Sequence, residues 1–463
     1  MQVMRRIRFW SIFGALAVVF FCCAETHSGQ PNPTTPVVES ISDSVPIFVL
    51  RGWMNSQEGI TLEELKIRAD KGEVLCTSDV NQVLGANWGI NAKTIVKSTF
   101  PFDSDSLLLL TTIDSVDGRW LACKLNDVSY FENPNDYAML IPSKHPFQFL
   151  KDVTSYTHTG VTAITRQTGG VLNKIGMDEY LKNILPYFKT PELVHISNEV
   201  SAVDSCVYGQ MKMSFATKTE HFGLIEKLGA DIIELTGNHN LDFGKAPYLA
   251  TLKWYEKRGM KYFGGGATPN QAKRPLVITL KDGSKIAWIG FNERCPCGEC
   301  ADKSMGANRW DSLQAVQTID SLRNRAGVNF IIGCVQFGET DSYSPTKSQK
   351  RISHLLMRMG VDVLIGSQAH QPQEVAIYNG KMLFYGIGNF MFDQIHRIGV
   401  RQAFFLQCYF YKGKIIQFQP VYTFMGPDRI PQIAGEDDKK LIQQAVLKSS
   451  NFPIRNVGPV MNK

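Results

Sequence analysis

Four polar clusters in the sequence have residue types and spacings suited to catalysis or metal binding. The most informative is Gly237-Asn-His-Asn-Leu-Asp-Phe-Gly244, which follows a short apolar run. In it, the amide oxygen of Asn238 can bind a metal ion, and His239 can donate a proton to a leaving oxygen. Asp242 either belongs to that site or caps a following helix. The other clusters are His195-Ile-Ser-Asn-Glu199, Gln336-Phe-Gly-Glu339 and Gly366-Ser-Gln-Ala-His-Gln371.

These clusters supply a complete set of candidate site residues. We predict catalytic roles for His239, Glu199 and Asp242, and metal ligation by Glu199, Asn238 and His370. The residues predicted to bind substrate are polar side chains at the later strand ends: Gln336, Glu339, Ser367, Gln368 and Asn389. Structural alternatives stay open, because loop histidines also stabilise turns and amide side chains are weak metal ligands. His195 lies inside a strand pattern and is predicted to be a core residue.

Strand-loop-helix units are expected to position these clusters. Apolar runs at 192–196, 231–235, 329–335 and 361–365 predict strands, and helical apolar spacing predicts helices at 312–325 and 346–359. Hairpins are predicted around Asp282-Gly283, Asn379-Gly380 and Lys412-Gly413. Because α/β folds carry their sites at the carboxyl ends of strands, we expect the clusters to meet at one edge of a layered α/β sandwich with mixed sheets.

A small α/β module is predicted before this domain, over residues 45–150. Thr61-Leu-Glu-Glu64 has the pattern of a capping box, which predicts a helix up to about residue 71. Apolar runs at 107–113 and 120–125 flank Asp117-Gly118 and predict a hairpin. No site residue is assigned in this module. The main domain is expected over 154–425, followed by a C-terminal tail at 426–463.

The N-terminus has the pattern of an export signal. Three arginines within residues 5–8 precede an apolar run at 9–21 that is too short to cross a bilayer as a helix. Cys22-Cys23-Ala24 follows, so either a peptidase cuts after Ala24 or a cysteine is lipidated and anchors the chain to a membrane surface. Residues 25–44 read as a flexible linker. We therefore expect an exported protein of the cell envelope, either a lipoprotein or secreted.

Export makes the remaining cysteines candidates for disulfides. Cys295, Cys297 and Cys300 are too close in sequence to pair only among themselves, which predicts one local bridge and one distant partner, such as Cys206. A zinc ion in this segment would lack a fourth ligand. Cys334 lies within an apolar strand pattern and is predicted to be a buried free thiol.

Composition limits the classes of partner. The 463 residues are 44% hydrophobic and 20% charged, which is ordinary for a globular protein of two or three domains. The net charge of +6 is small, and Lys and Arg do not cluster outside the N-terminus. Nucleic-acid binding needs a clustered basic surface, so we expect no nucleic-acid partner.

The stretch from residue 160 to 394 resembles the capsule-synthesis (poly-γ-glutamate, CapA-type) family. The resemblance rests on the 237–244 motif, on Phe263-Gly-Gly-Gly266, on 361–370 and most closely on Tyr385-Gly-Ile-Gly-Asn-Phe-Met-Phe-Asp-Gln394. It implies a calcineurin-like metallophosphoesterase sandwich. It also implies a role in synthesis, attachment or remodelling of an anionic surface polymer, or action on an envelope substrate that contains phosphoesters.

Several positions of the family's motifs are changed in this chain. Val161 stands where the family has Asp, Gln336 replaces a His, and of the family's histidine-rich tip only His370 remains. The resemblance then implies one divalent ion (Mn, Mg or Zn) or none, since a two-metal site needs more ligands. The implied chemistry is metal-assisted phosphoester hydrolysis, or amide hydrolysis or transfer by a nucleophile that the sequence does not identify. The alternative is a non-catalytic polymer-binding or assembly component with a degenerate metal site.

Overall fold

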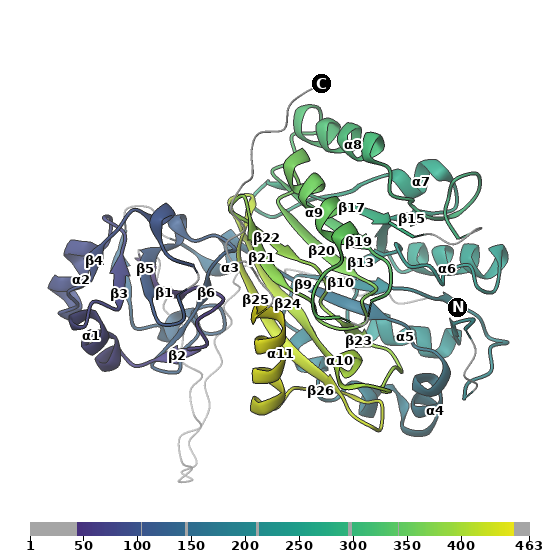
Figure 1. The fold of residues 1–463 in the computed structure, drawn as a ribbon, viewed down its shortest axis with the longest axis horizontal. Coiled ribbons are helices and arrows are strands. Elements are labelled where there is room, and N and C mark those ends of the chain that lie inside the picture. Colours follow the sequence, from purple (N-terminus) through teal and green to yellow (C-terminus); the bar gives the residue numbers. More distant parts are fainter. Residues whose placement is uncertain are drawn as a thin grey trace, which may run out of the picture. The chain divides into compact units, whose positions relative to one another are not determined.

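Two mixed β-sheets packed face to face form the core of the chain from residue 153 onward (Figure 1). The computed structural model describes residues 44–102, 104–143, 147–209, 213–294, 299–340 and 342–448. The predicted export signal, the predicted linker up to residue 43, Cys295, Cys297 and the end of the predicted tail lie outside the described residues.

The first sheet has the strand order β14-β13-β10-β9-β24-β25-β26, with β23 also paired to β9. Its β14, β13, β10 and β9 run parallel, whereas β24, β25 and β26 are antiparallel to their neighbours. The strands are β9 (Val153–Thr162), β10 (Leu193–Asn198), β13 (Ile232–Glu234), β14 (Lys261–Phe263), β23 (Asn389–Met391), β24 (Gln402–Tyr411), β25 (Lys414–Met425) and β26 (Pro431–Ile433).

The second sheet has the order β16-β17-β19-β20-β22-β21, with a parallel centre from β17 to β22 and antiparallel strands at both edges. The hairpins predicted around Asp282-Gly283, Asn379-Gly380 and Lys412-Gly413 are all present. The strands are β16 (Leu276–Thr279), β17 (Lys285–Asn292), β19 (Phe330–Gln336), β20 (Val363–Ser367), β21 (Val375–Tyr378) and β22 (Lys381–Phe384).

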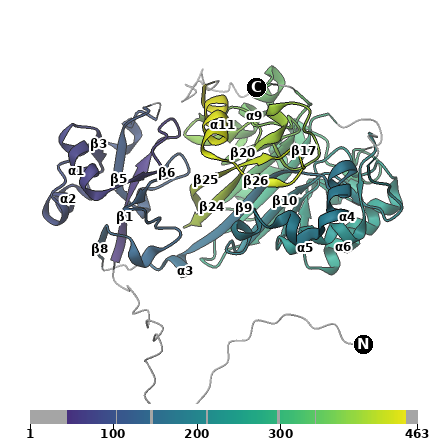
Figure 2. The ribbon, with the colours of Figure 1, turned by 90° about the horizontal axis from the view of Figure 1, so that it is seen from below.

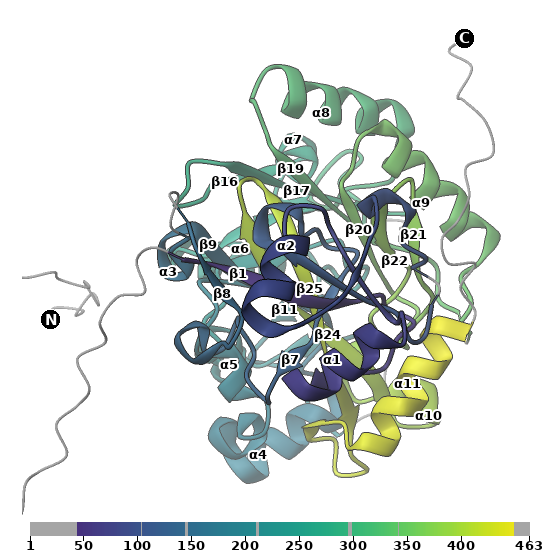
Figure 3. The same ribbon diagram turned by 90° about the vertical axis from the view of Figure 1, so that its left-hand side faces the viewer.

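Helices cover the outer face of each sheet, which gives four layers (Figures 2 and 3). Alternating residues explain the layering: Ile232 packs between the sheets, whereas Ile233 packs outward under the helices. The first sheet is covered by α4 (Arg166–Leu181), α5 (Thr219–Lys227) and α6 (Lys245–Lys257). The second is covered by α8 (Ser312–Asn324) and α9 (Lys347–Met359), and α9 begins with a capping box of Thr346 and Gln349. The predicted layered sandwich with mixed sheets is confirmed.

Short elements complete this part of the chain. They are the helices α3 (Phe149–Asp152), α7 (Pro269–Lys273) and α10 (Ile398–Arg401), and the strand pairs β11 (Ser201–Ala202) with β12 (Ala216–Thr217) and β15 (Gly265–Gly266) with β18 (Gly306–Ala307).

A separate sheet with the order β4-β3-β5-β1-β6 forms within residues 44–142, and β8 also pairs with β1. The hairpin predicted around Asp117-Gly118 is wrong, because β5 and β6 both pair with β1, one on each side, and not with each other. The elements are β1 (Ser44–Arg51), β2 (Gly59–Ile60), α1 (Leu62–Asp70), β3 (Val74–Cys76), α2 (Asn81–Trp88), β4 (Lys93–Thr94), β5 (Leu108–Thr112), β6 (Leu121–Ala122), β7 (Lys124–Leu125) and β8 (Leu140–Pro142).

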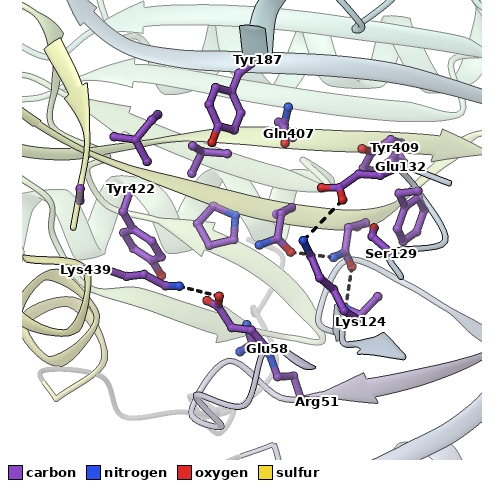
Figure 4. A pocket seen from close by; sticks show the side chains of 18 of the residues that line it. Arg51, Glu58, Lys124, Ser129, Glu132, Tyr187, Gln407, Tyr409, Tyr422 and Lys439 are labelled. Carbon is purple, nitrogen blue, oxygen red and sulfur yellow. Dashed lines mark hydrogen bonds and ion pairs between the residues drawn. The ribbon is translucent and has the colours of Figure 1, made fainter. Parts of the chain in front are cut away.

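Part of the segment predicted to be a tail is ordered structure. It contains β26 and the helix α11 (Glu436–Lys448), whose Ile442 and Val446 are buried. Lys439 of α11 forms an ion pair with Glu58 beside a cavity lined by residues of β1, β24, β25 and α11 (Figure 4). Hydrophobic residues on one face of α11 thus attach this segment to the core.

Two cysteine predictions are decided by the structure. Cys334 is a buried free thiol, as predicted, but Cys206 is also free, so it is not the distant partner of the cysteine-rich segment. Cys300 of that segment is in a disulfide. Within the described residues, no helix is both long and apolar enough to cross a bilayer.

Candidate functional site

Three oxygen atoms from three different strand ends converge on the side-chain amide of Gln336. Gln336 is the last residue of β19, and its Nε2 lies 3.0 Å from Glu199 Oε1, 2.5 Å from Asn238 Oδ1 and 2.5 Å from Gln368 Oε1. We call these four side chains, together with His239, Asp242 and His370, the strand-end cluster. The predicted meeting of distant loops at one sheet edge is therefore present in the structure.

Glu199 is the most buried carboxylate of the cluster, with 3% of its surface exposed. Its loop packs tightly on Gly237, where an added Cβ would lie 2.8 Å from both Cα and Cγ of Glu199. The glycine of the Gly-Asn-His motif is therefore required for close packing. Burial raises the pKa of Glu199, and its Oε2 has no hydrogen-bond partner, so a neutral or partly neutral carboxyl is favoured.

His239 and Asp242 form a hydrogen-bonded pair. His239 Nδ1 donates to Asp242 Oδ2 at 2.9 Å, and the backbone N–H of Phe215 donates to the same oxygen at 2.6 Å. Nε2 of His239 faces Asn238 Nδ2 at 3.3 Å. Burial works to lower the pKa of His239, but the hydrogen bond to Asp242 and the nearby Glu199 raise it overall. The pair can hold an imidazolium, and Asp242 does not cap α6, which has no side-chain cap.

His370 is held by two of the residues predicted to bind substrate. Its Nδ1 lies 2.9 Å from Asn389 Oδ1, and its Nε2 lies 3.1 Å from Glu339 Oε1. The hydrogen bond from His370 lowers the pKa of Glu339. Gln368 and His370 both have positive φ, 77° and 56°, a strained backbone conformation for residues other than glycine. Asn389 thus orients the imidazole of His370. The backbone is strained at Gln368 and His370, the two residues of this loop that belong to the cluster.

A buried ion pair and two aromatic rings connect the two histidines. Arg166 donates from Nε to both carboxylate oxygens of Asp393, at 3.1 and 3.0 Å. Its guanidinium lies over the rings of Phe215 and Phe392. Phe215 packs on His239 and Phe392 packs on His370, so this arrangement supports both sides of the cluster.

Glu299 is a member of this site that sequence reasoning missed. Burial and the nearby Asp242 raise its pKa to about 7, an effect that His239 partly offsets. One of its carboxylate oxygens is buried with no hydrogen-bond partner. Its position follows from the neighbouring cysteine, since Cys300 is bonded in a disulfide and pairs with Ala307. The only sequence signal was an acid within a constrained cysteine-rich loop.

The structure places the remaining predicted residue, Ser367, beside Gln336 in the register of β20 and β19. The backbone oxygen of Ser367 accepts a hydrogen bond from Phe337, and we assign it no contact with the cluster through its side chain. The cavity of Figure 4 is lined by none of the predicted site residues. The candidate site is therefore the strand-end cluster, which reaches solvent at the half-buried Asn238 and His239 and at the exposed Glu339.

The donor atoms of the cluster do not fit the two-metal centre that a metallophosphoesterase-like fold implies. The point on which three oxygens converge is filled by the Gln336 amide nitrogen, and both ring nitrogens of His370 contact other side chains. Within the described residues, the group of metal-binding side chains that does lie close together is His158, His195, Glu234 and Cys334, which includes none of the predicted ligands. We derive no metal-dependent step at the cluster.

Comparison with known proteins identifies the family that the sequence motifs resemble. The family profile described as "Bacterial capsule synthesis protein PGA_cap" matches residues 152–394. The PGA biosynthesis protein CapA of Bacillus subtilis is 23% identical over 246 residues, covering 52% of this chain and 64% of the relative. The capsule biosynthesis protein CapA of Bacillus anthracis is 22% identical over 245 residues, covering 51% of this chain and 59% of the relative. The match thus spans less than two thirds of either relative.

A comparison with solved structures finds the NAD nucleotidase of Haemophilus influenzae. The TM-score is 0.35 and the sequence identity 15%, with 65% of this chain and 56% of the nucleotidase covered.

Proposed function

Because this chain belongs to the bacterial capsule synthesis protein family, we propose that it is an envelope-associated accessory protein that binds an anionic glutamyl polymer during its synthesis, attachment or remodelling. The strand-end cluster is the proposed binding site. The family match lies on residues 152–394, which carry every member of the cluster.

The amide-rich character of the cluster is the observation that carries this proposal. A γ-glutamyl chain offers one backbone amide and one carboxylate per residue. The amides of Gln336, Asn238 and Gln368 meet at one point, and the imidazoles of His239 and His370 lie near Glu199, which contacts the same point. The half-buried Asn238 can offer an amide N–H to a carbonyl of the polymer, and an imidazolium donates to a carboxylate, so the two chemistries are complementary.

Protonation of the cluster decides whether it accepts an anion. Glu199 and Glu299 have raised pKa values because they are buried, and Glu299 titrates at about 7. The pKa of His239 is also raised, through its hydrogen bond to Asp242 acting against burial. Lowering the pH favours the neutral forms of the two acids and the cationic form of His239. Raising the pH favours the anionic acids and the neutral imidazole, so both changes weaken the binding of a polyanion.

We expect the affinity for a fluorescent oligo-γ-glutamate to fall roughly tenfold between pH 6 and pH 8, measured by anisotropy at constant ionic strength. His239→Ala should weaken binding at pH 6 and flatten the profile. His354→Ala is the matched control, because His354 contacts Tyr385 and Tyr378 and no member of the cluster. Absence of binding at pH 6, or unchanged binding by His239→Ala, would exclude this function for the cluster.

Acid-base catalysis is a second candidate function, favoured by the hydrogen-bonded His239–Asp242 pair. A carboxylate that orients a histidine is a common arrangement for proton transfer to a leaving group. As an amide hydrolase, the protein would let water attack the bound carbonyl, the C–N bond would break to leave a carboxylate, and His239 would give its proton to the leaving amine. The samples from the binding measurement distinguish the two functions. If the unmodified protein shortens the polymer and His239→Ala does not, the protein is an enzyme. If the polymer is bound but not shortened, the protein is a binding component.

The envelope location is supported by the N-terminal pattern of basic residues, an apolar run and paired cysteines. If the anchor is a lipid, replacing both Cys22 and Cys23 by Ala should move the protein from the membrane fraction to the soluble fraction. Membrane fractionation and N-terminal sequencing measure this. An unchanged distribution with a mature N-terminus at Glu25 would instead support cleavage after Ala24.

A further inference from the structure

Four side chains that bind metals in many proteins lie together in the core between the two sheets. His158, His195, Glu234 and Cys334 each offer a ligand atom, and these atoms all lie within 4.8 Å of one another. All four residues are buried. They come from β9, β10 and β13 of the first sheet and from β19 of the second.

Strand register accounts for the meeting of these residues. His158 and His195 are direct partners in the β9–β10 pair, and their rings stack with centroids 3.8 Å apart. Glu234 is the partner of Ser197, two residues beyond His195, and therefore points to the same face of the sheet. Cys334 lies in the facing sheet and is part of the same inter-sheet core.

One member of this group, His195, has no hydrogen-bond partner for either ring nitrogen. Its Nε2 lies 3.3 Å from Glu234 Oε2. A buried polar group without a partner is costly, so such a group in a native core indicates a ligand.

We propose that His158, His195, Glu234 and Cys334 bind one zinc ion that links the two sheets. Two imidazoles, one thiolate and one carboxylate are a normal tetrahedral ligand set for zinc, with ligands roughly 3.3–3.8 Å apart. Binding requires the ligand atoms, now within 4.8 Å of one another, to move inward and the two stacked imidazoles to tilt so that both lone pairs point at the ion. The zinc charge is balanced by one thiolate and one carboxylate, so the loaded site is neutral and suited to an apolar core.

Neighbouring residues orient the ligands. His158 Nδ1 lies 2.7 Å from the hydroxyl of Tyr156, which in turn accepts a hydrogen bond from Trp288 Nε1 at 2.9 Å. This leaves Nε2 of His158 as the ligand atom. Thr236 donates to Oε1 of Glu234, which leaves Oε2 toward His195. Metal ligands commonly have such outer hydrogen bonds.

The zinc ion would fix the strands that carry the strand-end cluster without touching it. Glu199 follows β10, Asn238 follows β13, and Gln336 ends β19. The ion is thus a structural one, and the inference is independent of the function proposed for the cluster.

Metal analysis of the purified, untagged chain tests the proposal. We expect one zinc per chain, and a cobalt-substituted sample should show the charge-transfer absorption of a cobalt-bound thiolate. Cys334→Ala should lose the zinc and the absorption, with a melting temperature lower by roughly 5 °C. Cys408→Ala should keep both, since Cys408 is an equally buried free thiol of the same inter-sheet core but outside the group.

Three results would overturn the proposal of a zinc site. They are a chain that contains no zinc even after refolding with zinc, a cobalt form without the thiolate absorption, and a Cys334→Ala protein that keeps its zinc. The first two use the unmodified sequence, so the test does not depend on whether a core variant folds.

Discussion

Asp393→Ala is expected to destabilise the chain by about 3–5 kcal/mol, because it removes the buried carboxylate that balances the charge of Arg166. The side chain of Asp393 is fully buried and that of Arg166 is 9% exposed. Besides two hydrogen bonds from Nε of Arg166, the carboxylate accepts one from the backbone N–H of Gln167 at 3.2 Å. Arg166 also has a positive φ of 46°, so the ion pair holds a strained residue in place.

Urea unfolding monitored by tryptophan fluorescence measures this loss. The matched control is Asp302→Ala, which removes a carboxylate from a bidentate pair with Arg309 whose side chains are 51% and 42% exposed. That change should cost less than about 1 kcal/mol, as surface ion pairs usually do. Equal losses in the two variants would contradict the stabilising role given to the buried pair.

Much of the layered fold could be predicted because it depends on local signals. The three correct hairpins have turn residues with positive φ, among them Gly283 at 83°, Asn379 at 51° and Gly413 at 70°. Glycine and asparagine adopt this conformation at low cost, so the sequence marks such turns directly. The helix predicted at 346–359 from its apolar spacing is present as α9, and the structure adds a capping box in which both reciprocal hydrogen bonds of Thr346 and Gln349 form.

The failed hairpin shows the limit of such signals. Asp117-Gly118 has hairpin composition, but an added Cβ at Gly118 would lie 2.3 Å from the ring of Phe418 on β25. The glycine is thus required by a contact with a residue 300 positions away in sequence. No local pattern reports that contact, nor the insertion of β1 between β5 and β6.

Candidate residues of the strand-end cluster could be predicted from the sequence because each ends or follows a recognisable strand. The hydrogen bonds between these residues could not be predicted from the sequence. That oxygens of Glu199, Asn238 and Gln368 all lie around the two N–H groups of the Gln336 amide depends on how two sheets align, which is a tertiary property. The group of His158, His195, Glu234 and Cys334 could not be predicted for the same reason, since its members come from four strands that are far apart in sequence. A polar residue at an inward position of two neighbouring strands was the available signal.

Gln336→Glu is expected to lower the free energy of unfolding by about 3–5 kcal/mol in the absence of divalent ions. The variant keeps the shape of the side chain, and its second oxygen can still accept from Asn292, whose Nδ2 lies 3.3 Å from Oε1 of Gln336. The amide nitrogen, however, is replaced by a carboxylate oxygen that faces the oxygens of Glu199, Asn238 and Gln368. The introduced carboxyl and that of Glu199 can share a proton, so the loss should be smaller near pH 5 than near pH 8.

Magnesium should reverse most of this loss, because carboxylate and amide oxygens converging on one point are the ligands that hard divalent cations prefer. Thermal unfolding with and without magnesium measures the effect. The unmodified chain should not respond, since the Gln336 amide already satisfies these oxygens, and Gln336→Met should be destabilised without any magnesium response. If the unmodified chain gained as much from magnesium as Gln336→Glu does, the amide would not be occupying a cation position. The amide of Gln336 thus makes this convergent set of oxygens a hydrogen-bonded cluster, whereas a carboxylate at the same position would make it a cation site.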